Sequence, residues 1–346
     1  MTINDVAERA GVSKATVSYV INGRNRVSDQ RRALVLQAME DLSYHPSAAA
    51  RSLIRQSTSL IGFLIQHAGD TVYLDPYFSE LIRGVAIMAD AHAYSPVMVT
   101  VKDEAHTREV YRRIAKNGLV DGIIVCHLSQ GDTYLLDEMG RDELPFVVVG
   151  SAEHRPCACV DTDNRGGAEQ AVAHLVGLGH RRIGFINGPR SFPHAAQRLL
   201  GFRGALLLSG LSPEECPVVD GGFLREGGYA AMAQLLEASE SPTAVFAASD
   251  QMAVGALHCL HERGMHVPDD VSVVGFDDNM LAPAAYPPLT TIHQPICQIG
   301  ESAMDLLFKK IRGLPSPSSI ILPTSLVARQ STGRPRDSEA ASQLAT

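Results

Sequence analysis

Apolar residues recur at helical spacing in three short stretches at the start of the chain. A residue whose side chain can cap a helix comes before each stretch: Thr2, Ser13 and Ser28. Gly11 suits the end of the first stretch, because glycine adopts the left-handed conformation that often closes a helix. The pattern therefore predicts three short helices, the first two of them joined by a tight turn.

From residue 59 the pattern changes to short apolar runs that alternate with longer stretches of helical periodicity. The runs are 60–65, 97–101, 122–126, 146–149, 183–186, 244–246 and 271–276, and the helical stretches are 78–91, 107–117, 166–178, 197–209, 226–237 and 250–263. This alternation predicts parallel sheets with helices on both faces. The length fits two such sheets, with a ligand cleft between the C-terminal ends of their strands.

The expected fold is thus an α-helical helix-turn-helix headpiece followed by a two-lobed α/β core. The expected division is a DNA-binding headpiece at 1–45, a hinge helix and linker at 46–58, an effector-binding and dimerisation domain at 59–333, and a disordered tail at 334–346. The tail is polar and has no heptad leucines, so it predicts no C-terminal coiled coil, and a dimer is expected rather than a tetramer.

Two short helices that are joined by a tight turn and braced by a third helix form a helix-turn-helix unit, whose second helix fits the DNA major groove. Lys14, Ala15 and Tyr19 are expected to read bases: Lys14 can donate to guanine, Ala15 can touch a thymine methyl, and Tyr19 can hydrogen-bond or pack. The residues expected at the phosphates are Ser13, Thr16, Ser18, Asn22, Arg24 and Asn25. A protein-interaction module is the alternative, but the solvent face of this helix is small, basic and polar.

The charge distribution favours an anionic partner for the headpiece alone. The whole chain carries a net charge of −8, but residues 1–56 carry +3 and the remainder carries −11. A basic head on an acidic body suggests that only the head meets a polyanion such as DNA. Chance asymmetry is the alternative.

Residues 45–53 predict a helix of only about two turns, which is marginal by itself in water. Leu53 is its one large apolar residue. A symmetric pair of such helices in the minor groove, each wedging Leu53 into a base step, would explain both features, and Arg51 would lie near phosphates. A plain linker helix is the alternative.

Polar and aromatic residues follow the predicted strands, where they would face the cleft. Arginine and aspartate together can grip hydroxyl groups, and aromatic rings can stack on a flat ring or a sugar face. The candidate effector-binding residues from this argument are Tyr77, Phe78, Asp163, Arg198, Phe223, Ser249 and Asp277. For Asp163 a helix cap is the alternative, as it is for Asp250; Arg198 could form a structural ion pair, and Phe223 could belong to the core.

Residues 2–18, with the sequence TINDVAERAGVSKATVS, together with Val27-Ser28 and 44–53, resemble the headpiece and hinge of the LacI/GalR repressor family. Residues 179–184, 249–256, 267–277 and 288–292 continue the resemblance, which covers about 2–333. It implies a homodimer on a pseudo-palindromic operator, with Leu53 as the intercalating residue. It also implies a core like periplasmic sugar-binding proteins, in which Arg198 and Asp277 contact the effector.

Two departures from the family pattern bear on specificity. Tyr19 stands where the family usually has arginine, which points to a different base preference with the same docking mode. Phe192 and His194 occupy the loop where a purine-responsive member would place polar or basic groups, so Phe192 joins the candidate effector residues. The expected function is a transcriptional regulator, most simply a repressor, with a sugar or related polyol as effector and a purine or nucleoside as the alternative.

Other classes of protein lack support in the sequence. No Gly-x-Gly-x-x-Gly, Gly-x-Ser-x-Gly or phosphate-loop motif follows a predicted strand, so an enzyme on a Rossmann-like fold is not expected. The six cysteines have no metal-site spacing, and neither metal nor cofactor is expected. A transport binding protein would need a signal peptide, and none is recognisable. With no apolar span for a membrane, the expected location is the bacterial cytoplasm, in association with the nucleoid.

Overall fold

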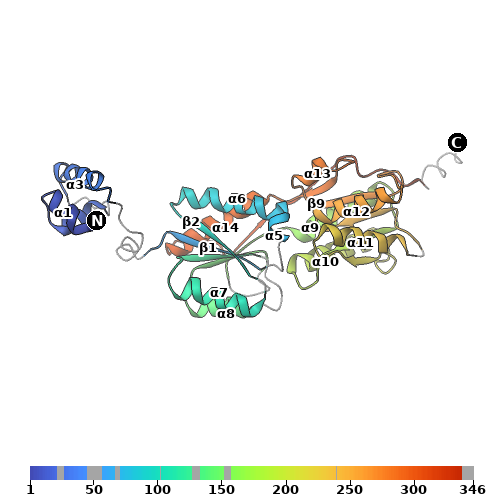
Figure 1. Cartoon of the computed structure of the whole chain (residues 1–346). Helices are drawn as coiled ribbons and strands as arrows, with labels where there is room; N and C mark the ends of the chain where they lie inside the picture. The colour runs from blue at the N-terminus through green and yellow to red at the C-terminus, as the bar shows by residue number, and fades with distance from the viewer. Residues whose placement is uncertain are drawn as a thin grey trace.

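The computed structural model describes residues 1–21, 27–44, 57–66, 71–101, 103–126, 133–151, 157–238 and 240–336. Figure 1 shows three packed bodies in these ranges, a three-helix unit and two α/β lobes. Several predictions lie outside the described residues: the DNA contacts of Asn22, Arg24, Asn25 and Arg51, the intercalation by Leu53, most of the predicted hinge, and the tail from residue 337.

The N-terminal unit consists of α1 (Ile3–Arg9), α2 (Lys14–Ile21) and α3 (Asp29–Asp41). Its small core joins Val6 of α1, Val17 and Val20 of α2, and residues of α3. Gly11 ends the first helix with φ +64°, as the sequence predicts. The Ser13 hydroxyl accepts a hydrogen bond from the Thr16 N–H at 3.2 Å and so caps α2. The three expected helices are confirmed.

The first lobe is built on a wholly parallel sheet with the strand order β11–β5–β4–β3–β1–β2. Its strands are β1 (Leu60–Gln66), β2 (Ser95–Val101), β3 (Gly122–Cys126), β4 (Phe146–Val149), β5 (Cys159–Thr162) and β11 (Ser319–Leu322). The short α5 (Thr71–Leu74) leads into α6 (Pro76–Ala91), which packs with α14 (Ile296–Ile311) on one face. The other face carries α7 (Glu104–Tyr111), the π-helical turn η1 (Arg112–Lys116) and α8 (Thr133–Arg141) (Figure 1).

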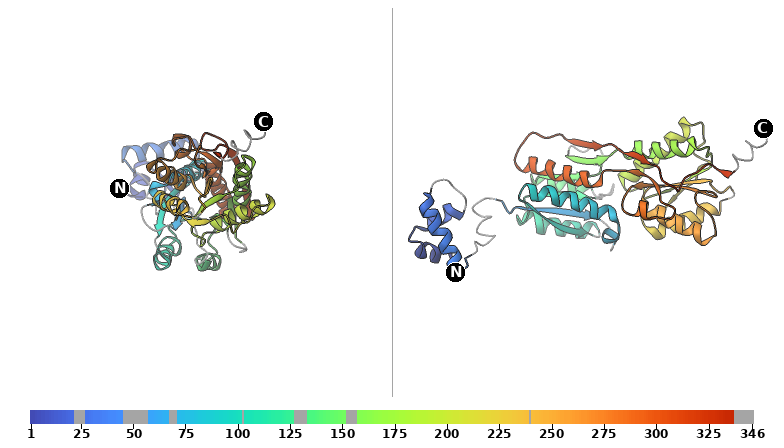
Figure 2. Two further views of the ribbon diagram at one scale, coloured as in Figure 1. Left: turned by 90° about the vertical axis from the view of Figure 1, so that its right-hand side faces the viewer. Right: turned by 90° about the horizontal axis from the view of Figure 1, so that it is seen from above.

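The second lobe repeats this plan with the strand order β12–β10–β9–β8–β6–β7. Its strands are β6 (Ile183–Asn187), β7 (Val218–Asp220), β8 (Ala244–Ala247), β9 (Ser272–Asp277), β10 (Thr290–His293) and β12 (Ser325–Val327), of which only β12 pairs antiparallel. Figure 2 shows the pair α9 (Asn164–Gly177) and α10 (Pro193–Leu208) on one side of the sheet and the pair α11 (Arg225–Leu236) and α12 (Asp250–Glu262) on the other. The short α13 (Leu281–Ala284) follows β9.

The chain passes between the two lobes three times, from β5 to α9, from β10 to α14, and from β11 to β12. Each lobe is therefore assembled from segments far apart in the sequence, and neither lobe is one continuous stretch. The crossovers after β5 and β11 are hydrogen-bonded to each other through the Asp163 N–H and the Leu322 carbonyl. Any change in the angle between the lobes has to be absorbed in the crossover segments.

The two-lobed parallel architecture is confirmed, but the pattern analysis does not pick out every element. It leaves out β5, β7, β10, β11 and β12, because these strands are short and mix polar with apolar residues. It also leaves out α8 and α14. The buried positions of α14 recur at helical spacing, so its periodicity could have been detected in the sequence.

Helices α6 and α14 pack unusually closely, and glycine makes the approach possible. A Cβ atom on Gly84 would overlap the carbonyl oxygen of Cys297, and one on Gly300 would overlap the carbonyl oxygen of Leu81. These carbonyl groups belong to helix backbone, which cannot move aside without opening the helix pair. The two glycines therefore set the distance between the helices that cover the first sheet.

Gly84→Ala should destabilise the protein by about 1–3 kcal/mol, the usual cost of overpacking a tight core. Gly140→Ala is the matched control, because a Cβ on Gly140 of α8 would meet no atom within 4 Å. Urea denaturation of the two variants and the parent measures the difference. Equal stability of Gly84→Ala and the parent would show that the α6–α14 contact can widen at no cost.

Candidate functional site

The second helix of the N-terminal unit presents the predicted base-reading residues to solvent. Lys14 and Ala15 are exposed and Tyr19 is half-buried, whereas Val17 and Val20 are buried against the other helices. The helix thus buries one face and leaves the opposite face open, which is the arrangement a recognition helix needs.

The predicted phosphate contacts in the described part of this unit lie at the start and middle of α2. The hydroxyls of Ser13 and Thr16 lie 2.9 Å apart and hydrogen-bond to each other in the first turn, and Ser18 is half-buried. Arg9 reaches across to Asp41 of α3 at 2.8 Å and ties the first helix to the third. The cap and this ion pair fix how α2 is presented.

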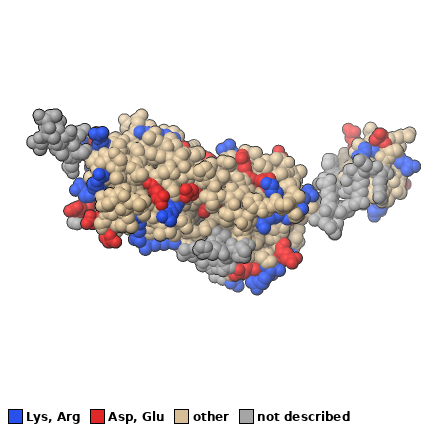
Figure 3. Space-filling model, turned by 180° about the vertical axis from the view of Figure 1, so that it is seen from behind, with Lys and Arg blue, Asp and Glu red and all other residues tan. Residues whose placement is uncertain are grey.

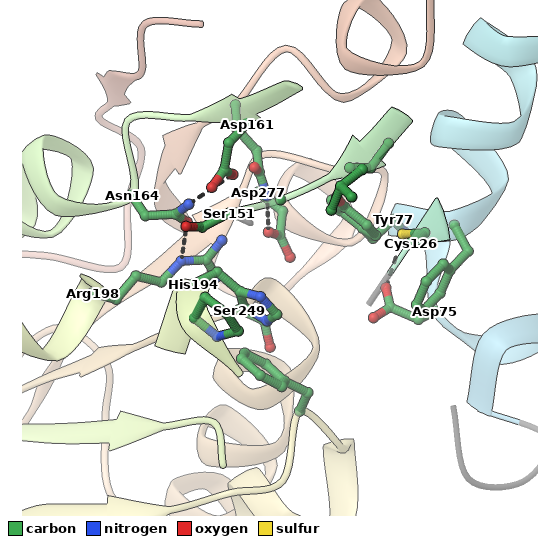
Figure 4. Close-up of a pocket in the computed structure, with 17 residues that line it drawn as sticks. Asp75, Tyr77, Cys126, Ser151, Asp161, Asn164, His194, Arg198, Ser249 and Asp277 are labelled. Carbon is green, nitrogen blue, oxygen red and sulfur yellow. Dashed lines mark hydrogen bonds between the residues drawn. The ribbon is translucent and has the colours of Figure 1, made fainter. Parts of the chain in front are cut away.

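A pocket of about 720 Å³, a volume that includes its opening to solvent, lies between the two lobes where their strand ends face each other (Figure 4). Its walls come from the ends of strands and the segments after them, at β1, β3, β4 and β5 of the first lobe and at β6, β7, β8, β9 and β10 of the second. The lining residues are Asp75, Tyr77, Phe78, Cys126, Val148, Val149, Gly150, Ser151, Asp161, Asn164, Pro193, His194, Arg198, Phe223, Ser249, Asp277 and Gln294.

Most of the predicted effector residues lie in this lining, namely Tyr77, Phe78, Arg198, Phe223, Ser249 and Asp277. Phe192 is outside the lining, but its ring contacts His194 and Phe223, with centroids 5.6 and 6.4 Å apart. Asp163 is also outside it. Its carboxylate caps α9 by accepting a hydrogen bond from the Gly166 N–H at 2.8 Å. Asp163 is therefore a helix cap, which was the alternative to an effector contact.

Arg198 is the cation of the pocket, and it is held mainly by neutral acceptors. Its Nε donates to the Asn164 Oδ1 at 2.9 Å, and its Nη1 donates to the carbonyl oxygen of Ala248. The guanidinium carbon lies 3.7 Å from the centroid of the Phe276 ring, which covers one face of the cation. Burial lowers the pKa of Arg198, and the nearby Asp277 opposes that shift. In the described residues, these contacts leave the two N–H groups of Nη2 and the second one of Nη1 to donate to a ligand.

Asp277 occupies a strained turn at the end of β9. It has φ +124° and Asp278 has φ +58°, both in the region that favours glycine. Asp278 is held by Arg329 at 2.6 Å and by His293 at 3.1 Å, and Gln294 donates to the Asp277 Oδ1 at 2.6 Å. Strain of this kind persists only where neighbouring contacts enforce it, and it concentrates at functional sites.

Phe223 also adopts a conformation that is rare for a bulky residue, with φ +59°. Its ring fits against Gly188, where a Cβ atom would overlap it. The ring of His194 lies 5.1 Å away, centroid to centroid. The glycine and the strained backbone together place an aromatic wall on the second-lobe side of the pocket.

Two carboxyl groups that the sequence analysis did not select, Asp75 and Asp161, also face the pocket (Figure 4). Asp75 caps α6 by accepting a hydrogen bond from the Tyr77 N–H at 2.9 Å. Asp161 is the third of the four residues of β5 and accepts hydrogen bonds from the Thr162 N–H and the Asn164 side chain. The sequence pattern predicts no strand at β5, and Asp75 comes shortly before a predicted helix, so neither carboxyl directly follows a predicted strand.

Burial dominates the ionisation of these groups. It raises the pKa of Asp75 and of Asp161 to about 6 each and that of Asp277 to about 7, and Arg198 opposes the shift in all three. Asp75 adds to the rise at Asp277, because the two carboxyls repel each other across the lobes. The pocket therefore holds acidic groups that protonate near neutral pH.

The polar residues around Asp250 serve as structure behind the pocket. Ser249, not Asp250, caps α12, accepting a hydrogen bond from the Met252 N–H at 3.2 Å. Asp250 is buried and binds the Thr291 hydroxyl at 2.6 Å and the Asn279 N–H at 3.0 Å, which joins α12 to the loops around β10. The alternative of a cap for Asp250 is therefore wrong.

The described parts of the chain contain no group of three or more histidine, cysteine, aspartate and glutamate side chains arranged to hold a metal ion. None of the helices there is both long enough and apolar enough to cross a membrane.

Residues 2–47 match the family described as bacterial regulatory proteins, lacI family, and residues 172–332 match the periplasmic binding protein-like domain. The chain is 35% identical over 336 residues to the HTH-type transcriptional regulator CelR of Thermobifida fusca, with 95% of this chain and 98% of that protein covered. It is 37% identical over 312 residues to the HTH-type transcriptional repressor PurR of Edwardsiella ictaluri, with 90% of each chain covered.

Solved structures show the same arrangement. A Lac repressor dimer bound to operator and the anti-inducer ONPF matches with a TM-score of 0.86 and 32% identity over 96% of this chain and 99% of that chain. A CelR–cellobiose complex matches with a TM-score of 0.76 and 33% identity over the same shares.

The variant Asp161→Asn replaces a buried carboxyl by a neutral amide of the same shape, and it should stabilise the ligand-free protein. Folding raises the pKa of the Asp161 carboxyl from 3.8 to about 6. This carboxyl therefore lowers the free energy of unfolding progressively as pH rises from 3.8 to about 6, and the full loss is present above that range. The melting temperature at about pH 8 should therefore rise by about 2–4 °C per kcal/mol of burial cost relieved.

The gain should shrink as pH falls from about 6 towards 4, since both forms are then neutral at this position. Asp220→Asn, which changes an exposed carboxyl at the end of β7, is the control. A variant that melts no higher than the parent at alkaline pH would mean that Asp161 is not a destabilising charge.

Proposed function

This chain belongs to the lacI family of bacterial regulatory proteins, and we propose that it represses transcription from a pseudo-palindromic operator under the control of a sugar-like effector. The proposal of a sugar-like effector rests on the pocket between the lobes, where Arg198 and Asp277 face aromatic side chains. The chain is a DNA-binding transcriptional regulator whose partners are operator DNA, a small-molecule effector and a second copy of itself.

The proposed division of the chain is the one the sequence suggests: headpiece 1–45, hinge 46–58, two-lobed domain 59–333 and tail 334–346. In the headpiece, Lys14, Ala15 and Tyr19 read bases from the exposed face of α2. Ser13, Thr16, Ser18, Asn22, Arg24, Asn25 and Arg51 contact the backbone, and Leu53 wedges into the minor groove; for the last five the support is the sequence alone.

The charge on the lobes supports the view that DNA meets the headpiece. Figure 3 shows acidic and basic side chains interspersed over the visible face of the core, with wide uncharged areas between them. A surface of mixed sign offers no continuous track for a phosphate backbone. The headpiece is therefore the proposed DNA-contacting part.

The effector we propose is a sugar or related polyol. Arg198 and Asp277 supply a donor and an acceptor for adjacent hydroxyls, while Tyr77, Phe78 and Phe223 supply flat apolar faces for a ring. Phe192 supports the ring of Phe223 from behind. A purine or nucleoside is the alternative that similarity to PurR proteins favours, but Phe192 and His194 provide an aromatic wall in place of a set of polar groups.

Control of DNA binding follows from linkage between the pocket and the lobe angle. The effector touches both lobes, so it favours the angle at which both sets of contacts are made. That angle sets the spacing of the two hinges in a homodimer and hence their fit to the operator. This regulatory role, without catalysis, is the one we propose, and it places the protein on bacterial DNA in the cytoplasm.

Lys14→Ala and Tyr19→Ala should change which operator bases are preferred, because each removes a contact to a base edge worth about 1–3 kcal/mol. Arg9→Ala is the contrasting variant, since Arg9 bonds to Asp41 and is not a proposed base contact. Selection of bound sequences from a randomised operator pool measures the preference. An unchanged base preference in Lys14→Ala would remove Lys14 from base readout.

Asp277→Asn should abolish the response of operator binding to effector and leave the ligand-free affinity for operator unchanged. The amide keeps an acceptor for Gln294 but loses the charge that grips hydroxyls. The effector is first found by a thermal-shift screen of sugars, polyols, nucleosides and purines, since a ligand of the folded state raises the melting temperature.

Asp220→Asn serves again as control and should respond to the effector as the parent does. A normal response in Asp277→Asn would assign Asp277 to structure. A thermal-shift response to purines or nucleosides alone would replace the sugar with the alternative class.

A further inference from the structure

The pocket offers a ligand more hydrogen-bond acceptors than donors. Asp75, Asp161 and Asp277 each use Oδ1 to accept hydrogen bonds from protein N–H groups. Asp277 accepts a second hydrogen bond from the backbone N–H of Asp250, whereas in the described residues Oδ2 of Asp75 and of Asp161 receives none. All three side chains line the pocket, so the carboxyls keep unused acceptor lone pairs for a ligand.

The guanidinium of Arg198 does not form a hydrogen-bonded ion pair with any of these three carboxyls in the described residues. Its Nε donates to Asn164 and its Nη1 to the Ala248 carbonyl, so in the described ranges its hydrogen bonds go to neutral groups. The other ionisable groups that face the space are Tyr77 from α6, Cys126 from β3 and His194 from α10, while Asp250 of α12 lies behind Asp277. The lining thus has three acidic groups and one fixed cation.

Asp75 and Asp277 come from different lobes and repel each other across the cleft. Asp75 stands at the start of α6 in the first lobe, and Asp277 stands at the end of β9 in the second. A positive group placed between them would pair with both carboxyls and draw the lobes together. Buried charges need such a partner, because burial without one is costly.

We propose that the effector is an amino sugar whose protonated amine binds between Asp75 and Asp277. An ammonium group has three N–H donors and no acceptor, which matches the unused acceptor lone pairs of the two carboxyls. Arg198 and Asp161 then hold ring hydroxyls, and the rings of Phe78 and Phe223 cover the sugar face. A phosphorylated sugar would be repelled. The inference rests on the proposed function and narrows its sugar class.

Calorimetric titration of the full chain tests the inference with matched ligand pairs. The pairs are glucosamine and glucose, galactosamine and galactose, mannosamine and mannose, and the glucosamine disaccharide and cellobiose. At about pH 7, at least one amine should bind about tenfold or more tightly than its neutral parent. Its N-acetyl and 6-phosphate derivatives should lose that advantage.

The key variant is Asp75→Asn, which keeps the α6 cap because asparagine caps helices as well as aspartate does. It should lower the preference for the amine over the parent sugar by about fivefold or more. Asp103→Asn removes the charge of another N-cap aspartate, at α7, and should keep the preference. Asp103→Asn should also leave operator binding without ligand unchanged.

The number of protons released when the ligand binds gives a second readout, independent of affinity. At about pH 6 the pocket carboxyls are partly protonated, so binding of a cation should release protons, whereas a neutral sugar should release few. Titrations in buffers of different ionisation heat measure this release.

The outcomes separate this inference from the proposed function. If neutral parents bind as tightly as the amines and shift operator affinity, the amine assignment is wrong and the sugar-responsive regulator stands. Tighter binding of a 6-phosphate, or an unchanged preference in Asp75→Asn, would likewise overturn the assignment. If neither amines nor neutral sugars bind or alter operator affinity, both the amine and the sugar class are wrong.

Discussion

The burial of one guanidinium organises the space between the lobes. Arg198 can stay charged there only because Asn164, the Ala248 carbonyl and the Phe276 ring surround it on three sides. These partners come from α9, from the end of β8 and from β9, so the arginine ties together the ends of several second-lobe elements. The same contacts hold the guanidinium in the pocket lining, where its remaining N–H groups can donate to a ligand. Structural and ligand-binding roles are therefore combined in one side chain.

The acidic groups around Arg198 show a trade between stability and binding. A core optimised for stability would place apolar residues where Asp75, Asp161 and Asp277 lie, since burial raises their pKa values towards neutrality. The strained backbone of Asp277 and Phe223 adds to that cost. Destabilising features of this kind are concentrated at a binding site when contacts with the bound ligand offset them. Binding of an effector in the pocket would therefore stabilise the protein.

The sequence predicts the architecture and the chemistry of the second lobe better than it predicts the first-lobe side of the pocket. Asp277 ends a long apolar run, and Arg198 lies in the helix that follows another, so a place near the strand ends could be inferred for both. Asp161 is the third residue of a four-residue strand that contains polar side chains, and the sequence favours Asp163 in its place. Alternation along a strand sends neighbours two apart to the same face, but the turn after Thr162 breaks that rule. Side-chain direction in such a turn depends on tertiary contacts.

Two amide side chains, those of Asn164 and Gln294, can couple ligand binding in the pocket to the crossover segments between the lobes. Asn164 lies where the chain crosses from β5 into α9, and Gln294 lies where it crosses from β10 into α14. Asn164 bonds to both Asp161 and Arg198, and Gln294 bonds to Asp277. A ligand that moves either charged group must therefore strain or relax a crossover segment directly. Because the lobes can rotate only through these segments, two hydrogen-bonded amides suffice to link ligand chemistry to lobe angle, without a longer chain of side chains.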